Sequence, residues 1–334
     1  MGLGYSHVLR RGLSLLILLA VGTTHIVLAQ QNPSSPLAVA AAPDDESLEF
    51  RIVKRVDEVN LRFTVTDSHG RFQNQLTTDD FFVLDNHQPP AAIHFFQQQS
   101  TLPMRVGILI DVSSSVASRF KFEQKAAGVF LKKVLRPGYD EAFVVTFDNN
   151  VRLLEDWTSD PESAFQKVHA LHAGGETALY DAVIFASDKL REHPAESISR
   201  PVIILITDGD DTASKAILSD AQQAAAQAET ILFALSTNDL SQGSHPKGET
   251  VLELLSTPTG GRILPAHQST ELAAAFAKIE QALRSEYVVG YQPSDLKLDG
   301  SFRPVEIRPL KSKLQVRSRR GYYAPREIPT DQPF

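Results

Sequence analysis

The chain has 334 residues, with 33 Lys and Arg against 40 Asp and Glu, so its formal net charge is −7. Hydrophobic residues make up 42% and charged residues 22%, which is enough for a packed core and argues against a disordered chain. The acidic balance argues against nucleic-acid binding, because phosphate contacts need clustered Lys and Arg. The sequence has no cysteine, which excludes disulfides, thiolate metal sites and cysteine nucleophiles.

The N-terminus has the pattern of a secretory signal peptide. Arg10 and Arg11 precede an apolar run at residues 13–21, and small residues lead to Ala29. We therefore expect a signal peptide at residues 1–29. An uncleaved membrane anchor is the alternative, although polar residues at 23–25 leave the apolar run short for a full span. A secreted protein without cysteine suits a bacterial envelope, so we expect a secreted or periplasmic location.

After the signal peptide, the sequence pattern changes from that of a linker to that of β-strands. Residues 30–49 are rich in Pro, Ser and Ala, which predicts a flexible linker. Apolar residues then alternate from Val59 to Val65, the period of a half-buried strand. Two further strands are predicted at residues 81–84 and 93–96, with turn-forming residues between them. Residues 50–99 are therefore predicted to form an N-terminal β module.

From residue 103 to 285, buried apolar strands alternate with helical patterns. The predicted strands are residues 106–110, 142–147, 202–206, 231–235 and 261–264. The predicted helices are residues 120–135, 161–171, 178–190, 219–228, 249–256 and 270–283. This alternation predicts an α/β fold, a doubly wound and mostly parallel sheet with helices on both faces, flanked by small antiparallel β segments.

The C-terminal part again has the sequence pattern of β-strands. Strands are predicted at residues 287–291, 302–307 and 314–316, within a β segment of residues 286–324 that is followed by a loose tail at 325–334. The two β segments are each too small for a secure core. We therefore expect them to pair into one module beside the α/β domain.

Side chains with oxygen atoms follow two of the buried strands and one glycine pair. They are Asp111, Ser113 and Ser115 after the first strand, Thr177 after Gly174-Gly175, and Asp208 after the strand at 202–206. In an open α/β sheet, ligands bind where the strands end and their loops diverge. Oxygen ligands without His or Cys suit a hard cation such as Mg²⁺, with Mn²⁺ as a substitute. Each motif alone is weak, because Asp-x-Ser-x-Ser and Thr-Asp-Gly also occur in ordinary turns.

In this order the motifs resemble the metal-ion-dependent adhesion site (MIDAS) of von Willebrand factor type A (VWA) domains. The mature chain is similar to a bacterial group of secreted VWFA-related proteins, and the resembling stretches are Thr78-Asp79-Asp80-Phe81, residues 174–182, residues 207–211 and Arg319-Arg320-Gly321-Tyr322-Tyr323. The resemblance implies that Ser113, Ser115 and Thr177 bind the metal directly. It implies that Asp111 and Asp208 act mostly through water or by holding the direct ligands.

The resemblance also implies a function. Neutral hydroxyl ligands leave most of the charge of the ion uncompensated, so its open position attracts a carboxylate from a partner protein. We expect a metal-dependent binding protein rather than an enzyme, with no nucleic-acid partner and no integral membrane domain after signal cleavage. We expect Asp181 to cap or orient the neighbouring loop. Asp210 and Asp211 either tune the site or are solvated turn residues, and the role of Glu176 stays open.

Two other functions stay open. A Mg²⁺-dependent hydrolase would need a nearby base or several carboxylates, and the sequence has no His-Glu-x-x-His, Gly-x-Ser-x-Gly or Gly-x-x-x-x-Gly-Lys motif. His169 and His172 are expected to lie at a helix end rather than to bind zinc. In the second alternative, the protein is structural and the β modules carry the binding surface.

Overall fold

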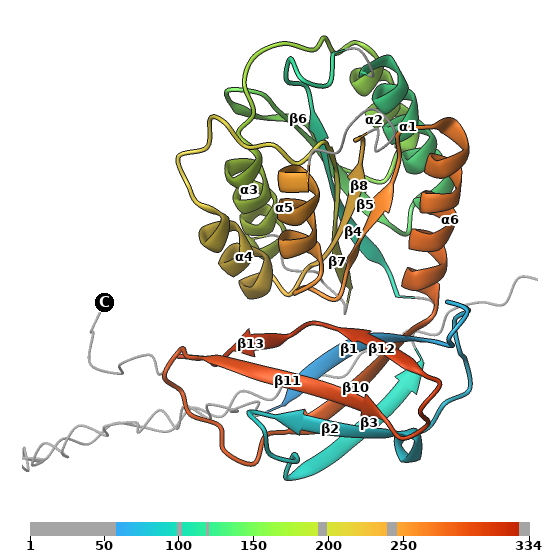
Figure 1. Cartoon of the computed structure of the whole chain (residues 1–334), viewed down its shortest axis with the longest axis vertical. Coiled ribbons are helices and arrows are strands. Elements are labelled where there is room, and N and C mark those ends of the chain that lie inside the picture. Colours follow the sequence, from blue (N-terminus) through green and yellow to red (C-terminus); the bar gives the residue numbers. More distant parts are fainter. Residues whose placement is uncertain (1–57, 99–101, 118–119, 193–198, 239–245, 327–334) are drawn as a thin grey trace, which may run out of the picture. The chain divides into compact units, whose positions relative to one another are not determined.

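The computed structural model describes residues 58–98, 102–117, 120–192, 199–238 and 246–326 (Figure 1). The predicted signal peptide, the linker and the first residues of the β module lie outside these ranges, as does the end of the tail. Within the described ranges, no helix combines the length and apolarity that crossing a membrane requires.

A six-stranded sheet forms the centre of the α/β domain, with the strand order β6-β5-β4-β7-β8-β9. Its strands are β4 (Met104–Asp111), β5 (Glu141–Phe147), β6 (Val151–Thr158), β7 (Arg200–Thr207), β8 (Ile231–Ser236) and β9 (Arg262–Pro265). All neighbouring strands are parallel except β5 and β6. The strands β4 and β7 are apolar runs because both of their faces are covered, as in other parallel sheets.

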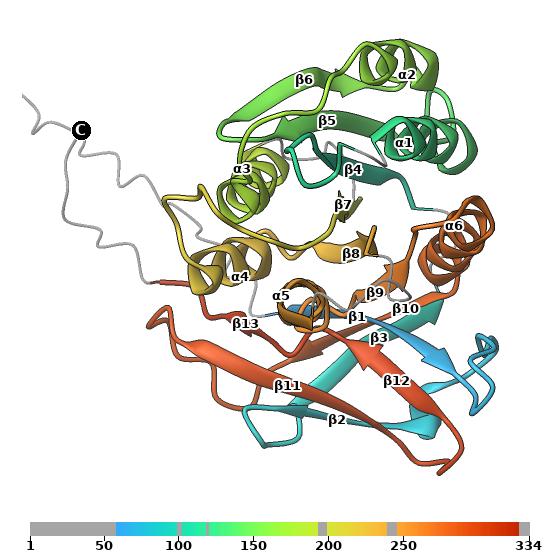
Figure 2. The ribbon, with the colours of Figure 1, turned by 45° about the horizontal axis from the view of Figure 1, so that its top comes forward.

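Helices cover both faces of this sheet (Figure 2). They are α1 (Phe120–Val134), α2 (Pro161–His169), α3 (Leu179–Glu192), α4 (Leu218–Gln227), α5 (Pro246–Ser256) and α6 (Ser269–Arg284). Ile108 of β4 belongs to the core shared with α1, α2 and α6, whereas Leu109 belongs to the core shared with α3, α4 and α5. The alternation of side chains along a strand therefore supplies two separate cores.

The topology of the sheet creates one position where loops diverge. From β4 the chain continues to β5 and β6 on one side, and it then returns to place β7 on the other side of β4. The order of the strands therefore reverses between β4 and β7, whose registers pair Ile110 with Ile206. Ligands of open α/β sheets bind at such a switch point, beyond the C-terminal ends of the strands.

The remaining strands form two antiparallel sheets. One has the order β12-β1-β10-β3 and the other β13-β11-β2. Their strands are β1 (Val59–Thr66), β2 (Phe81–Asp85), β3 (Ala92–Gln98), β10 (Glu286–Gln292), β11 (Phe302–Pro309), β12 (Gln315–Ser318) and β13 (Gly321–Tyr323), and a short 3₁₀ helix, η1 (Thr78–Asp80), precedes β2. Side chains from both sheets share one hydrophobic core. N-terminal and C-terminal strands therefore pair with each other, as expected from their small size.

The predicted fold class is confirmed, and the structure adds two strands that the sequence pattern did not reveal. β6 lies at the sheet edge, and its burial does not alternate regularly because only parts of it are covered. β13 is three residues long and pairs with the start of β11. The predicted helix at 161–171 ends earlier, at His169, and the predicted helix at 249–256 begins earlier, at Pro246.

Candidate functional site

The first loop of the site follows β4 and begins with a fully buried carboxylate. Asp111 has no exposed surface, and its Oδ1 accepts a hydrogen bond of 2.9 Å from the backbone N–H of Ser113. The Oγ atoms of Ser113 and Ser115 lie 3.0 Å apart, with Ser113 buried and Ser115 exposed. The Asp-x-Ser-x-Ser spacing therefore gathers one carboxylate and two hydroxyls in a single turn.

Thr207 connects this loop to the end of β7. Its Oγ1 donates a hydrogen bond of 2.6 Å to Oδ2 of Asp111 and accepts one of 3.1 Å from the N–H of Gly209. Because Ile110 pairs with Ile206, Asp111 and Thr207 are the next residues along two adjacent parallel strands. The sequence pattern alone did not identify Thr207 as a residue of the site. The polar residue at the end of an otherwise apolar strand was the available signal, but its partner depends on the strand pairing.

The loop that carries Thr177 is held against both other loops by backbone hydrogen bonds. The N–H of Ser114 donates to the carbonyl of Gly175 at 2.9 Å. The carbonyl of Thr177 accepts from the N–H groups of Thr212 and Ala213, both at 2.9 Å. The N–H of Thr177 donates to Oγ1 of Thr212 at 3.0 Å. Three segments that are far apart in sequence are thus joined directly at the switch point.

The carboxylates of Asp211 and Asp181 join α3 to the loop after β7 by hydrogen bonds in both directions. Oδ1 of Asp211 accepts from the N–H groups of Leu179 and Tyr180, at 2.8 and 3.3 Å, at the start of α3. In return, the carboxylate of Asp181 accepts from the N–H groups of Lys215 and Ala216, at 3.1 and 3.0 Å. Asp181 orients the neighbouring loop as expected. Asp211 is more than a solvated turn residue, because it caps the helix that follows Thr177.

Asp208 lies in a tightly packed turn. Its side chain is 5% exposed, and its Oδ1 accepts a hydrogen bond of 3.2 Å from the N–H of Asp210. Its carbonyl accepts from Nδ2 of Asn238 at 2.7 Å. Gly209 has φ +88°, and a Cβ there would lie 2.5 Å from the carbonyl oxygen of Gly248. The first turn of α5 therefore packs directly on this turn and leaves no room for a side chain.

The electrostatics of the site favour a bound cation. Burial raises the pKa of Asp111 to about 6, and the nearby charge of Asp208 adds to this increase, whereas hydrogen bonds from Ser113 and Thr207 oppose it. Asp111 forms no ion pair with any residue that the structure describes. Two buried carboxylates with three hydroxyls are a donor set that fits a hard divalent ion. Such an ion would compensate the charge that burial destabilises.

His169, expected at a helix end, and Glu176, whose role the sequence left open, have contacts of their own. His169 is the last residue of α2, and its ring stacks on Phe165 at 5.9 Å between centroids. Glu176 is exposed, and its Oε2 accepts a hydrogen bond of 3.2 Å from Nδ2 of Asn149. Within the described residues, no three His, Asp or Glu side chains gather in a way that could hold a metal.

Comparisons with known proteins find one matching family model and several similar solved structures. Residues 106–210 match the family model of the von Willebrand factor type A domain. No match was found among curated proteins. Similar solved structures include BatB from Bacteroides thetaiotaomicron, with 17% identity over 55% of this chain and 100% of that chain and a TM-score of 0.45. A von Willebrand factor type A protein from Catenulispora acidiphila has 14% identity over 78% of this chain and 77% of that chain, with a TM-score of 0.44.

A third similar structure contains a metal. Proximal thread matrix protein 1 from the mussel byssus, solved with a zinc-occupied MIDAS motif, has 13% identity over 59% of this chain and 49% of that chain. Its TM-score is 0.43.

Proposed function

Because residues 106–210 of this chain match the family model of the von Willebrand factor type A domain, we propose that the protein binds a divalent cation and uses it to recognise a protein partner. The proposed ligands are Ser113, Ser115 and Thr177, with Asp111 and Asp208 acting mostly through water or by holding these ligands. Mg²⁺ is the proposed ion and Mn²⁺ the substitute, because both accept oxygen ligands.

The burial of Asp111 carries this proposal. Its carboxylate is fully buried, forms no ion pair with a described residue, and lies near the charge of Asp208. A buried carboxylate is normally paired, protonated or bound to a metal. The neighbouring hydroxyls of Ser113 and Ser115 add uncharged donors at hydrogen-bond distance from each other. With uncharged hydroxyls as its direct ligands, a divalent cation that satisfies this group would keep part of its positive charge.

The partner is proposed from that residual charge. An ion held by hydroxyls directly and by carboxylates at longer range attracts an anionic ligand into its open position. A Glu or Asp side chain of another protein supplies such a ligand. Ser115 is exposed, so the site is accessible from solvent. We also propose that residues 1–29 direct export to a bacterial envelope, where this recognition would take place.

Two alternative functions, a hydrolase and a structural protein, predict different experimental results. A hydrolase would use the same ion to activate water, so its turnover of phosphoesters or peptides would depend on Mg²⁺ and on Asp111. In a structural protein, the antiparallel sheets would bind the partner, and binding would survive loss of the metal.

Calorimetric titration of Mg²⁺ and Mn²⁺ into residues 30–334 tests the proposal. We expect saturable binding to the unchanged sequence and none to Asp111→Asn, with the fold of both confirmed by circular dichroism. Asp188→Asn is the matched control, because Asp188 is partly exposed on α3 and pairs with Arg191. Absence of binding to the unchanged sequence, or equal binding to Asp111→Asn, would contradict the proposal.

Partner recognition needs a second measurement. Immobilised protein is offered to envelope proteins from the same source, with Mg²⁺ or with a chelator. Retention of a partner that is lost in the chelator and in Ser113→Ala/Thr177→Ala supports recognition through the metal. Retention that is equal in all three conditions favours the structural alternative.

A further inference from the structure

A small hollow lies at the end of the α/β domain opposite to the switch point, against the sheet that contains β1. Its volume is about 20 Å³, and three arginines line it: Arg62, Arg262 and Arg317. Arg62 lies on β1, Arg317 on β12 and Arg262 at the start of β9. Three elements that are distant in sequence therefore each contribute one arginine to the lining of this hollow.

The strand register explains why two of these arginines face the same way. Phe63 and Val65 point into the core between the antiparallel sheets, so Arg62 and Thr64 point to the opposite face of β1. Arg317 of β12 pairs with Thr64 of β1, so its side chain lies on the same face. Glu286 pairs with Thr64 from the other neighbour, β10. Thr64 is thus flanked by a cation on one side and an anion on the other.

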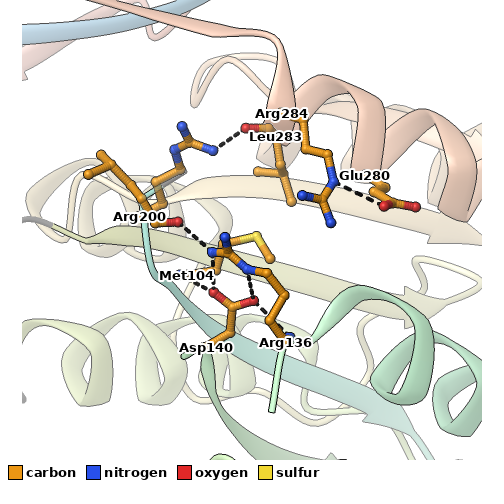
Figure 3. A network of polar contacts seen from close by, with 8 residues as sticks. Met104, Arg136, Asp140, Arg200, Glu280, Leu283 and Arg284 are labelled. Atoms are coloured by element: carbon orange, nitrogen blue, oxygen red, sulfur yellow. Dashed lines mark hydrogen bonds and ion pairs between the residues drawn. The ribbon is translucent and has the colours of Figure 1, made fainter. Parts of the chain in front are cut away.

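The single carboxylate in the lining of the hollow already forms an ion pair. Glu286 is buried and forms an ion pair of 2.9 Å with Nε of Arg200. Arg200 also donates a hydrogen bond to the carbonyl of Leu283, at the C-terminal end of α6. Figure 3 shows Arg200 beside this end of α6 and near a second arginine, Arg136, which is paired with Asp140. The negative groups around the hollow therefore already have cationic partners.

Arg262 and Arg317 have no such partner, whereas Arg62 acts on the carboxylate of Glu286 through its charge. Among the described residues, none of them forms an ion pair, and the Nε atoms of Arg62 and Arg262 are buried without a hydrogen-bond acceptor. Arg62 and Arg317 each donate one hydrogen bond to a backbone carbonyl, of Ser199 and Gly261, both at 3.1 Å. Burial lowers the pKa of Arg262, and the charge of Arg317 lowers it further. Arg262 and Arg317 therefore repel each other at a partly buried site.

We propose that this hollow binds a monatomic anion, chloride, held between Arg62, Arg262 and Arg317. The lining has three arginines and one carboxylate, so a bound anion reduces its excess of positive charge and accepts hydrogen bonds from guanidinium N–H groups. The volume of the hollow accommodates one particle of about the size of water and is too small for phosphate or a nucleotide. The side chains of all three arginines are partly exposed, so the ion can enter from solvent.

The proposed anion has a structural consequence. Arg62 and Arg317 belong to the antiparallel sheet, whereas Arg262 belongs to the α/β domain. One ion between them would offset their repulsion and stabilise the packing of the two layers. This inference does not depend on the proposed metal site, which lies at the other end of the β strands, and its tests are made with a chelator present.

The first test measures the unfolding temperature of the full chain at constant ionic strength while gluconate, which is too large to enter, is replaced by chloride. We expect a saturable rise of roughly 3 °C at ten times the dissociation constant. Arg262→Met keeps the length of the side chain but removes its charge, and it should abolish the rise. Arg308→Met is the matched control, because Arg308 is exposed and lies in a surface pair with Glu306. An equal unfolding temperature in chloride and gluconate would overturn the proposal.

The second test needs no variant and remains valid if Arg262→Met fails to fold. Crystals of the full chain are soaked in bromide, which replaces chloride and is located by its anomalous scattering. A peak between the guanidinium groups of Arg62, Arg262 and Arg317 supports the proposal. Electron density for water alone, without an anomalous peak in the hollow at saturating bromide, would overturn it.

Discussion

Thr207 donates its hydroxyl hydrogen to the carboxylate of Asp111 over 2.6 Å, and this bond joins the C-terminal ends of β7 and β4 at the switch point of the sheet. Both residues are fully buried. The same hydroxyl accepts from the N–H of Gly209, so it also fixes the turn that carries Asp208. One side chain therefore sets the relation between the two carboxylates of the site.

Thr207→Val keeps the shape of this side chain but removes the hydroxyl. We expect a loss of about 1.5–3 kcal/mol in the free energy of unfolding, because a buried hydrogen bond to a charged group is lost. We also expect Mg²⁺ affinity to fall by roughly tenfold, the equivalent of about 1.4 kcal/mol. Urea unfolding and calorimetry measure the two effects. Thr207→Ser retains the hydroxyl and should recover most of both, so equal effects of the two substitutions would contradict this role.

The protonation of Asp111 makes stability depend on pH when no metal is bound. Its pKa is raised from 3.8 to about 6 in the folded protein, mainly by burial. The folded state therefore holds the proton more tightly than the unfolded state, and this contribution to stability is complete below pH 4 and is lost as the pH rises through 6. The difference between the unaltered protein and Asp111→Asn should change by up to about 3 kcal/mol over this window.

The measurement is urea unfolding of both proteins with a chelator at several values between pH 4 and 7.5. Asn cannot ionise, so the variant removes the effect of this group and retains that of all others. A stability difference that does not vary with pH would show that Asp111 ionises at its ordinary pKa.

Asp211→Ala removes the cap at the start of α3, where Asp211 accepts from the N–H groups of Leu179 and Tyr180. We expect a loss of about 1–2 kcal/mol in the free energy of unfolding. Mg²⁺ affinity should also fall, because α3 directly follows Thr177. Asp220→Ala, at the start of α4, is the control: it removes a contact at the start of a helix but should leave Mg²⁺ affinity unchanged. Unchanged affinity in Asp211→Ala would show that the cap does not position Thr177.

Asp140→Ala should cause the largest loss of stability among these variants. Asp140 is fully buried and accepts from the N–H of Met104 at 2.8 Å and from the guanidinium of Arg136 at 2.7 and 2.8 Å (Figure 3). Removing one partner of a buried ion pair leaves the other uncompensated, which costs about 3–5 kcal/mol. Thermal unfolding measures this loss. Asp140→Ala/Arg136→Met should be more stable than Asp140→Ala alone, and an equal stability would contradict the explanation.

The sequence predicted the elements whose pattern is local. Strands β4, β7 and β8 are apolar runs and most helices have a clear period, so their approximate ranges follow from the chain itself. β6 escaped prediction because it lies at an edge and is covered irregularly along its length. Asp211 was open to two interpretations for a similar reason. Its role as a cap depends on a helix that begins 32 residues earlier in the chain.

By itself the sequence determined the α/β fold, the pairing of two β segments that are too small to fold alone, and five candidate ligands at the ends of predicted elements. Only the tertiary structure decided that Thr207 links the two site carboxylates, that Asp211 and Asp181 clasp each other's segments, and that three arginines surround one hollow. Side-chain periodicity depends on neighbours a few residues away, and a sequence displays it directly. Contacts across strands depend on the order and register of the sheet, and these are decided only when the whole core packs.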